Sequence, residues 1–273
     1  MGRMSILIYI QNNIKNVWAF CWGCLIGILG GLIGLGGAEF RLPVLVGIFK
    51  YRILTAIIIN LIVSFVTVVF SFLFRTKHID LSCVVTNTPI ILNILFGTLI
   101  GSYIGVNLAT KINEQALYRI VTVFLVGLSA VLIGHDLIMY NQGIQMMAPL
   151  RIFLGFIAGI GIGVFSSMLG VAGGELIIPT IILLFSVDIK IAGSLSLAIS
   201  IPTIAMGLVK YKDRQLFHEI RPQFTFIIFL SLGSIAGALI GSYLLSFVSV
   251  PVLHVILGAI LLISAIKMAI RKK

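Results

Sequence analysis

The stretch GLGGAEFRLP, residues 34–43, interrupts a hydrophobic segment that runs from residue 17 to residue 49. It places Glu39 and Arg41 among apolar residues, and glycines and a proline surround the two charges. Glycine commonly ends a helix, and proline is common in the first turn of the next one. The stretch therefore predicts a break within the segment, followed by a half-helix led by Pro43.

The composition of the chain is strongly apolar. Hydrophobic residues make up 60% of its 273 residues and charged residues only 10%, the mean hydropathy is +1.20, and soluble domains carry about 25% charged residues. Segments of about 18 apolar residues suffice to cross a bilayer as helices. Such segments lie near residues 17–49, 53–74, 84–109, 117–134, 152–187, 189–209, 222–247 and 250–266. Because the sequence lacks the ten-residue stretches of alternating polarity that β-barrels need, we predict an all-α, polytopic integral membrane protein.

The formal net charge is +11, and its distribution separates two classes of partner. The basic residues gather in the links between apolar segments and at the C-terminus, rather than on a face interleaved with aromatic residues. That distribution is typical of cytoplasmic loops beside anionic lipid and unlike a nucleic-acid surface. We expect the lipid bilayer as surroundings, no nucleic-acid partner, a cell (inner) membrane location and cytoplasmic termini. We interpret residues 1–14, which lack a signal-peptide cleavage pattern, as a short N-terminal leader.

The interrupted stretch recurs as GVAGGELIIP, residues 170–179, at an offset of 136 in the numbering. Between Gly23 and Pro43, seven of 21 positions are identical at this offset, and GTLIGSY at 97–103 recurs as GALIGSY at 237–243, at an offset of 140. A longer link in the second half would explain the difference between the two offsets. Because duplicated halves are common in transporters, we predict two homologous repeats, each with a broken first hydrophobic segment. Their bounds are 15–140 and 150–273, with a linker at 141–149.

The first hydrophobic segment of each repeat is too long for one straight crossing, since a helix rises about 1.5 Å per residue. Residues 17–49 could form one crossing with an unwound centre, or two half-helices in a re-entrant hairpin. The first arrangement gives eight crossings and parallel repeats, whereas the second gives six crossings and inverted repeats. The distribution of Lys and Arg agrees with both, so the sequence leaves both open.

Backbone that leaves a helix inside a membrane must be buried in protein or line a wet cavity. The half-helix after such a break presents free N–H groups and the positive end of its dipole, which attract anions. Two half-helices facing one cavity therefore predict a site for a small anionic substrate, in a permease rather than an enzyme. No cofactor or metal is expected, because the four histidines are scattered in the sequence. The candidate binding residues are Gly36, Gly37, Ala38, Glu39, Arg41, Pro43, Asn60, Gly173, Gly174, Glu175, Pro179 and Ser194.

Each charged or polar candidate has two interpretations. Glu39 and Glu175 could couple transport to a proton, or each could cap the half-helix that follows it. Arg41 could hold an oxyanion through its fork of donors; otherwise it forms an ion pair with Glu39 or reaches an interface. Asn60 and Ser194 could line the transport path, or they could form hydrogen bonds between helices.

Cys21 and Cys24 have the spacing of a redox pair, which makes a transmembrane thiol carrier the alternative function. The opposing interpretation is two small residues on a packed helix, because no neighbouring residue in the sequence would activate a thiol. Ile157 and Ile160 stand at the equivalent positions of the second repeat. The duplication therefore did not preserve the thiol pair.

The chain resembles the sulfite exporter TauE/SafE family, also called the 4-toluene sulfonate uptake permease family. The resemblance rests on the paired Gly-rich stretches at 34–43 and 170–179, on Ala192-Gly-Ser-Leu195 and on the duplicated architecture. It implies an inner-membrane secondary permease for small anions, commonly sulfur-containing ones such as sulfite or sulfonates, without an ATPase of its own. Many members carry an apolar residue where Glu39 and Glu175 stand, so coupling through these residues would depart from the family pattern. A homo-oligomer is compatible with this interpretation.

Overall fold

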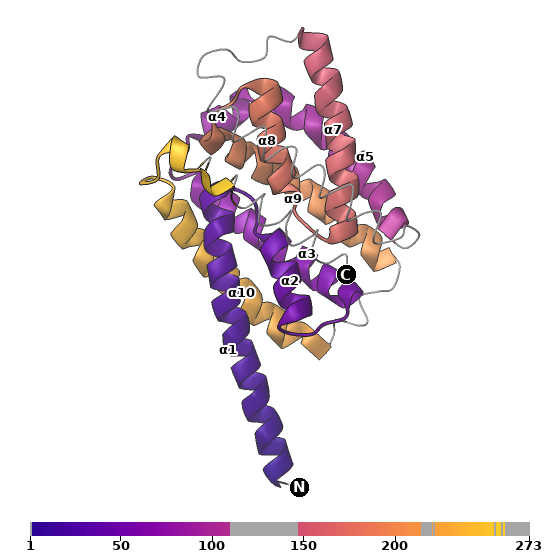
Figure 1. Ribbon diagram of the computed structural model, residues 1–273, viewed down its shortest axis with the longest axis vertical. Helices are drawn as coiled ribbons and strands as arrows, with labels where there is room; N and C mark the ends of the chain where they lie inside the picture. Colours follow the sequence, from indigo (N-terminus) through magenta and orange to yellow (C-terminus); the bar gives the residue numbers. More distant parts are fainter. Residues whose placement is uncertain are drawn as a thin grey trace.

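The computed structural model describes residues 2–109, 147–213, 220, 222–253, 255–257 and 259 (Figure 1). Within these residues every regular element is helical and no strand occurs. The helices are α1 (Gly2–Ile33), α2 (Ala38–Gly47), α3 (Ile53–Arg75), α4 (Leu81–Thr86), α5 (Thr88–Ala109), α7 (Ala148–Leu169), α8 (Gly174–Phe185), α9 (Ile189–Asp213) and α10 (Phe224–Leu244). The all-α prediction is confirmed for the described part of the chain.

Six of the described helices are long and apolar enough to cross a membrane. The candidate spans are Asn13–Ile33, Thr55–Arg75, Thr88–Leu108, Ala148–Met168, Ile189–Lys212 and Phe224–Leu244. They support a multi-pass membrane protein, as the composition predicts. The segment expected at 117–134 lies outside the described residues, and so does most of the one expected at 250–266.

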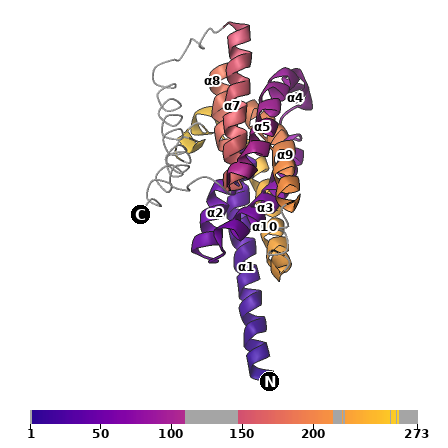
Figure 2. The ribbon, with the colours of Figure 1, turned by 90° about the vertical axis from the view of Figure 1, so that its right-hand side faces the viewer.

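Close backbone contact joins α1 to α10 along a stripe of small residues (Figures 1 and 2). Cβ atoms added at Gly23, Gly27 and Gly31 would collide with the carbonyl oxygens of Leu230, Ser234 and Ala238, respectively. The partners rise together along both chains, so the two helices run parallel. Glycines four positions apart allow this approach, because a helix surface without side chains lets the neighbouring backbone come near.

The helices α5 and α7 pack on each other in the same way. Between these two helices, Cβ atoms at Gly97, Gly101 and Gly105 would collide with the carbonyl oxygens of Phe156, Ile160 and Val164, respectively. Between α10 and α1, Cβ atoms at Gly233, Gly237 and Gly241 would collide with the carbonyl oxygens of Phe20, Cys24 and Ile28, respectively. Every one of these contacts has its counterpart in the other half, at an offset of 136 in the numbering of both partners. The offset of 140 between the two GxLIGSY stretches is therefore one helical turn out of register with the packing. Because glycines recur at every fourth position there, the sequence matches in either register.

The first Gly-rich interruption follows a complete span rather than dividing one. α1 continues to Ile33 and is long enough to cross a membrane by itself. The chain then turns back, and the backbone of Gly37 packs against the carbonyl of Ile26. This reversal needs φ values of 95° at Gly34 and 81° at Gly36, which residues with a Cβ rarely adopt. The hydrophobic segment is thus a long helix followed by the short α2, which differs from both arrangements considered from the sequence.

Candidate functional site

Two Gly-rich breaks, residues 34–37 and residues 170–173, meet inside the protein. The first links α1 to α2, and the second links α7 to α8. A Cβ atom on Gly174 would lie 2.8 Å from Cα of Leu35 and 3.1 Å from the carbonyl oxygen of Gly34. Glycine candidates from the two halves of the chain therefore lie together, at a place that we call the break junction.

Asn60, on α3, forms hydrogen bonds with both sides of the break junction. Its side chain is fully buried, and Nδ2 donates to the carbonyl oxygens of Ala38 at 3.0 Å and Gly170 at 2.8 Å. On α9, the Ser200 hydroxyl donates to the carbonyl oxygen of Ala172 at 2.9 Å. The structure thus brings the candidate Asn60 to the junction, and it adds Ser200, which sequence reasoning did not select.

Arg41, on α2, is fully buried, and the acceptors of its hydrogen bonds are all neutral oxygens. They are Ser64 Oγ at 2.9 Å, Thr67 Oγ1 at 3.2 Å, the Gly36 carbonyl at 3.3 Å, and Asn60 Oδ1 and Ser234 Oγ at 3.4 Å. The carboxylate of Glu39 interacts with this charge electrostatically, yet neither of its oxygens has a hydrogen-bond partner. Nε of Arg41 also lacks a partner. The guanidinium therefore lies beside the first break with a donor unused, and it neither forms a hydrogen-bonded ion pair with Glu39 nor reaches the protein surface.

Glu39 and Glu175 stand in the first turns of α2 and α8. The N-cap residues of these helices are Gly37 and Gly173, both in the left-handed conformation, and neither helix has a side-chain cap. Both oxygens of Glu39 and Oε2 of Glu175 are buried without a hydrogen-bond partner. The two carboxyl groups also interact electrostatically with each other. Two acidic groups, one from each half of the chain, thus interact with each other, and Glu39 also interacts with the buried charge of Arg41.

The prolines stand elsewhere in the short helices than the sequence suggests. α2 begins at Ala38 and α8 at Gly174, so Pro43 and Pro179 each occupy the sixth helical position rather than the first. A proline inside a helix has no N–H for the carbonyl four positions earlier. The prediction that the half-helices start at the prolines is therefore wrong. The free N–H groups belong to the residues just after the glycine N-caps.

Ser194 belongs to a different cluster, around a second fully buried arginine. Arg75, at the end of α3, donates from Nε to Ser194 Oγ at 3.2 Å and from Nη2 to the Lys190 carbonyl at 2.7 Å. Its Nη1 donates to the carbonyl oxygens of Gly31 at 3.0 Å and Leu32 at 2.9 Å. Arg75 thus caps the C-terminal end of α1 and holds the start of α9 against it. Sequence reasoning missed this residue, because a basic residue at the end of an apolar segment is the usual pattern of a topogenic charge.

The offset of 136 identifies further counterpart residues around the breaks. The hydroxyl of Tyr211 donates to the Ser167 carbonyl at 3.0 Å, and at this offset these two residues are the counterparts of Arg75 and Gly31. Ser196, rather than Ser194, is the counterpart of Asn60. Its side chain is fully buried, and its hydroxyl lacks a hydrogen-bond partner.

The two cysteines of the proposed thiol pair form no disulfide with each other in the structure. Cys21 is exposed and Cys24 half-buried, and both are free thiols. The backbone of Cys24 contacts Gly237 of α10, as expected for a small residue on a packed helix. Among the described residues no group of three or more His, Cys, Asp or Glu side chains could hold a metal ion.

Comparison with known protein families gave a match in the second half of the chain. The family model for the sulfite exporter TauE/SafE matches residues 154–273. This part of the chain is similar to the TauE/SafE family. The matched region includes most of α7, the second break, α8, α9 and α10. Comparison with curated proteins and with solved structures gave no match.

Similarity to the TauE/SafE family indicates a broad class of activity. The family consists of transporters of sulfur anions rather than enzymes, and the six candidate spans agree with a membrane permease. Neither finding supports a thiol redox carrier.

Proposed function

We propose that this chain is a secondary-active permease for a small sulfur-containing anion, such as sulfite or a sulfonate, and that the anion binds at the break junction. The observation that carries the proposal is the buried charge of Arg41, which neutral oxygens alone hold beside the first break. An oxyanion would supply the hydrogen-bonded negative partner that this guanidinium lacks, through charge-assisted hydrogen bonds. The free N–H groups at the starts of α2 and α8 would add donors.

Glu39 and Glu175 are the coupling residues in this proposal, and the coupling ion is a proton. The two carboxyl groups already repel each other when both are ionised. An anion bound beside Arg41 would add to that repulsion, so anion binding and proton binding would favour each other. Substrate and proton would then move together through one site. Because a carboxyl group at membrane depth is costly, its presence at both breaks argues for a functional role.

Alternating access would come from motion of one repeat, residues 15–140, against the other, residues 150–273. The reciprocal packing supports this division, since α1 packs on α10 and α5 packs on α7 through counterpart contacts at the offset of 136. The directions of the helices support inverted repeats: in Figure 1, α1 starts at the bottom of the molecule and α7 at the top. We place the protein in a cell (inner) membrane with both termini in the cytoplasm, and a homo-oligomer remains compatible with this site.

The proposal is tested with the purified full chain in liposomes. Radiolabelled sulfite, methanesulfonate, sulfate, acetate and the zwitterion glycine are offered under an imposed pH gradient, and protein-free vesicles serve as the control. We expect sulfite or methanesulfonate to accumulate above the control, with little movement of glycine. Uptake of every sulfur anion at the level of protein-free vesicles, with either sign of the gradient, would rule the proposal out. A Cys21→Ser/Cys24→Ser double variant should transport fully, whereas loss of transport would favour the thiol carrier.

A further inference from the structure

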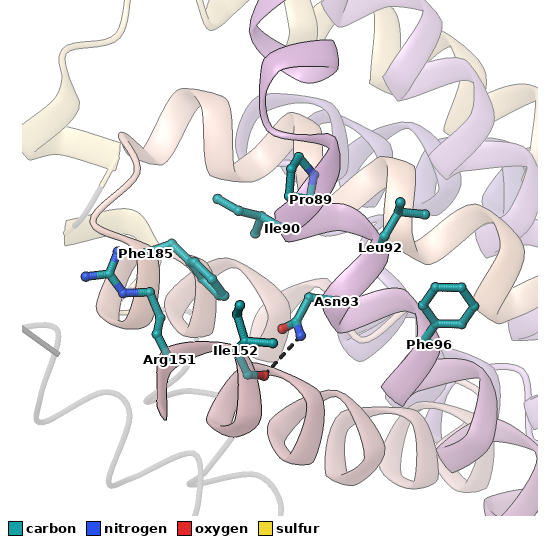
Figure 3. A pocket seen from close by; sticks show the side chains of 8 residues that line it. All are labelled: Pro89, Ile90, Leu92, Asn93, Phe96, Arg151, Ile152 and Phe185. Carbon is teal, nitrogen blue, oxygen red and sulfur yellow. Dashed lines mark hydrogen bonds between the residues drawn. The ribbon is translucent and has the colours of Figure 1, made fainter. Parts of the chain in front are cut away.

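A separate cavity lies at the first turn of α7, between α5 and the end of α8 (Figure 3). Its volume is about 420 Å³, and most of its wall is apolar, with Ile90, Phe96 and Phe185 among the lining residues. Its two polar members are Asn93 on α5 and Arg151 on α7. None of these residues belongs to the break junction, so the cavity needs its own explanation.

Two buried polar atoms of the cavity residues have no hydrogen-bond partner. Nδ2 of Asn93 donates to the carbonyl oxygen of Ile152 at 3.0 Å, but its Oδ1 is buried and unpartnered, and so is Nε of Arg151. Arg151 also stands in the first turn of α7, whose N-cap residue, Met147, forms no side-chain cap. The unused donor and the positive end of the helix dipole both favour an anion.

The cavity opens toward the side of the helices that faces lipid. Leu92, Phe96 and Ile152 in its wall are 44%, 59% and 55% exposed, and all three lie on helices that are candidate membrane spans. Such exposure is expected where acyl chains, rather than protein, cover the surface. Arg151, near the start of its span, lies at the depth where phosphate headgroups are found.

The equivalent place in the other half of the chain is filled. Lys15 is the counterpart of Arg151 at the offset of 136, and its Nζ lies 4.5 Å from the ring centre of Tyr51 and 5.2 Å from that of Phe226. Phe226 in turn packs edge-on against Phe49, at 4.8 Å between ring centres. Burial raises the pKa of the Tyr51 phenol, so the phenol stays protonated. Its hydroxyl donates a hydrogen bond to Gln223 Oε1 at 2.7 Å. Aromatic rings thus fill this place and engage the cation.

Two substitutions leave the cavity open at Arg151. At the same offset, Ile90 is the counterpart of Phe226, and Val187 is the counterpart of Tyr51. Smaller side chains therefore replace the two rings that engage Lys15 in the first half. The cavity is a difference between the two halves rather than a consequence of their common packing, which favours a ligand specific to this end of the protein.

We propose that the cavity binds an anionic glycerophospholipid from the surrounding bilayer. The phosphate accepts hydrogen bonds from Arg151, a headgroup hydroxyl donates to Asn93 Oδ1, and one acyl chain lies along Leu92 and Phe96. Basic pockets between transmembrane helices are suited to such headgroups. A small soluble anion would leave the apolar wall uncovered, so a ligand with a long hydrocarbon chain fits the lining better.

The test measures lipid binding to the purified full chain in detergent, by native mass spectrometry and by the shift in unfolding temperature. We expect phosphatidylglycerol to bind at least about tenfold more tightly than phosphatidylcholine, a difference of about 1.4 kcal/mol. Arg151→Gln should abolish this preference. Ile90→Phe, which introduces the ring found at Phe226, should exclude the lipid while keeping Arg151. Lys15→Gln is the matched control at the filled place and should leave lipid binding unchanged.

Two outcomes would overturn the proposal. One is the same preference for phosphatidylglycerol in both Arg151→Gln and Ile90→Phe, each shown to be folded by its unfolding transition. The other is displacement of bound lipid by millimolar inorganic phosphate or sulfite, which would identify a site for soluble anions instead. The readout is binding and not transport, so failure here leaves the proposed function at the break junction untouched.

Discussion

The side-chain amide of Asn60 donates a hydrogen bond of 2.8 Å to the carbonyl oxygen of Gly170, 110 residues further along the chain. The same nitrogen donates to Ala38 at 3.0 Å, so a single residue of α3 connects the start of α2 with the end of α7. The Gly170 carbonyl lies past the last turn of α7, and a carbonyl without a helical partner at membrane depth must find another donor. Asn60 supplies that donor and also contacts the first residue of α2, so it joins the two halves at the breaks.

Replacing Asn60 should therefore impair transport more than stability. Asn60→Leu removes two hydrogen bonds, at a cost of about 1 kcal/mol each, and no side chain then connects the two breaks. We expect the transport rate in liposomes to fall at least about tenfold. Ser71→Ala is the matched control, since this buried hydroxyl of α3 has no hydrogen-bond partner. Equal effects of the two substitutions would contradict the role given to Asn60.

Arg41 should determine affinity for the anion. Arg41→Lys keeps a positive charge but loses the fork of donors, and Arg41→Gln loses the charge as well. We expect KM for the transported anion to rise about tenfold in the lysine variant and further in the glutamine variant, since tenfold corresponds to about 1.4 kcal/mol. Initial rates over a range of anion concentrations measure this. Arg52→Gln, at an exposed arginine, should leave KM unchanged; an unaltered KM in both Arg41 variants would remove Arg41 from the binding site.

The pH dependence of transport should originate in Glu39 and Glu175. Each glutamine variant carries a permanently neutral side chain, so the step that needs proton binding no longer responds to pH. We expect uptake by the wild type to vary between about pH 5 and 8, and Glu39→Gln and Glu175→Gln to flatten that profile. Asp80→Asn is the control. The backbone N–H of Ser82 holds the pKa of Asp80 below its usual range, so this group stays ionised throughout and its replacement should leave the profile unchanged. Unchanged profiles in both glutamate variants would end the coupling hypothesis.

Two glycines of α7 provide a direct test of the helix packing. A Cβ atom at Gly163 would collide with the carbonyl oxygen of Thr98 on α5, whereas one at Gly161 meets nothing within 4 Å. Gly163→Ala should therefore push α5 and α7 apart and lower the unfolding temperature by several degrees. Gly161→Ala should be neutral or slightly stabilising, because alanine favours a helix by up to about 1 kcal/mol over glycine. Thermal unfolding in detergent measures both, and a Gly163→Ala protein as stable as the wild type would contradict the packing.

The sequence predicts the parts of this fold that depend on composition and local pattern. Apolar length identifies the spans, and glycine recurrence identifies the two breaks and the close helix contacts. The position of each break relative to its helix could not be predicted in the same way. The run from residue 17 to residue 49 is rich in glycine and leucine on both sides of Gly34, so only the left-handed φ values of the glycines fix the reversal after Ile33.

For the candidate site, too, the sequence predicts some residues and not others. Asn60 and the break glycines could be selected because polar or flexible residues are rare in apolar segments. Ser194 was selected from the same rarity, yet it serves Arg75, because a one-dimensional pattern does not tell which neighbouring helix a side chain contacts. The same limit explains why Arg75 was missed. Its role depends on the carbonyl groups at the end of α1, which become free only when that helix ends at Ile33.

Among the residues that hold the two halves together, Arg75 should be the one whose replacement lowers the free energy of unfolding most. Its replacement by glutamine leaves the carbonyl oxygens of Gly31 and Leu32 without their donor in a buried place and removes one donor of the Lys190 carbonyl. Hydrogen bonds from charged donors contribute about 1.5–3 kcal/mol each, so Arg75→Gln should lower the free energy of unfolding by at least about 2 kcal/mol.

Two conservative variants set the scale for this loss. Ser194→Ala removes one of the acceptors of Arg75, and Tyr211→Phe removes the counterpart bond to the Ser167 carbonyl at the end of α7. Each should cost about 1 kcal/mol or less, since a neutral hydrogen bond inside a membrane protein contributes little more. Denaturant titrations of the three variants in one detergent would establish the order. If Arg75→Gln is no less stable than Ser194→Ala, the guanidinium does not hold α9 against the end of α1, and the contact between the halves depends on the glycine packing alone.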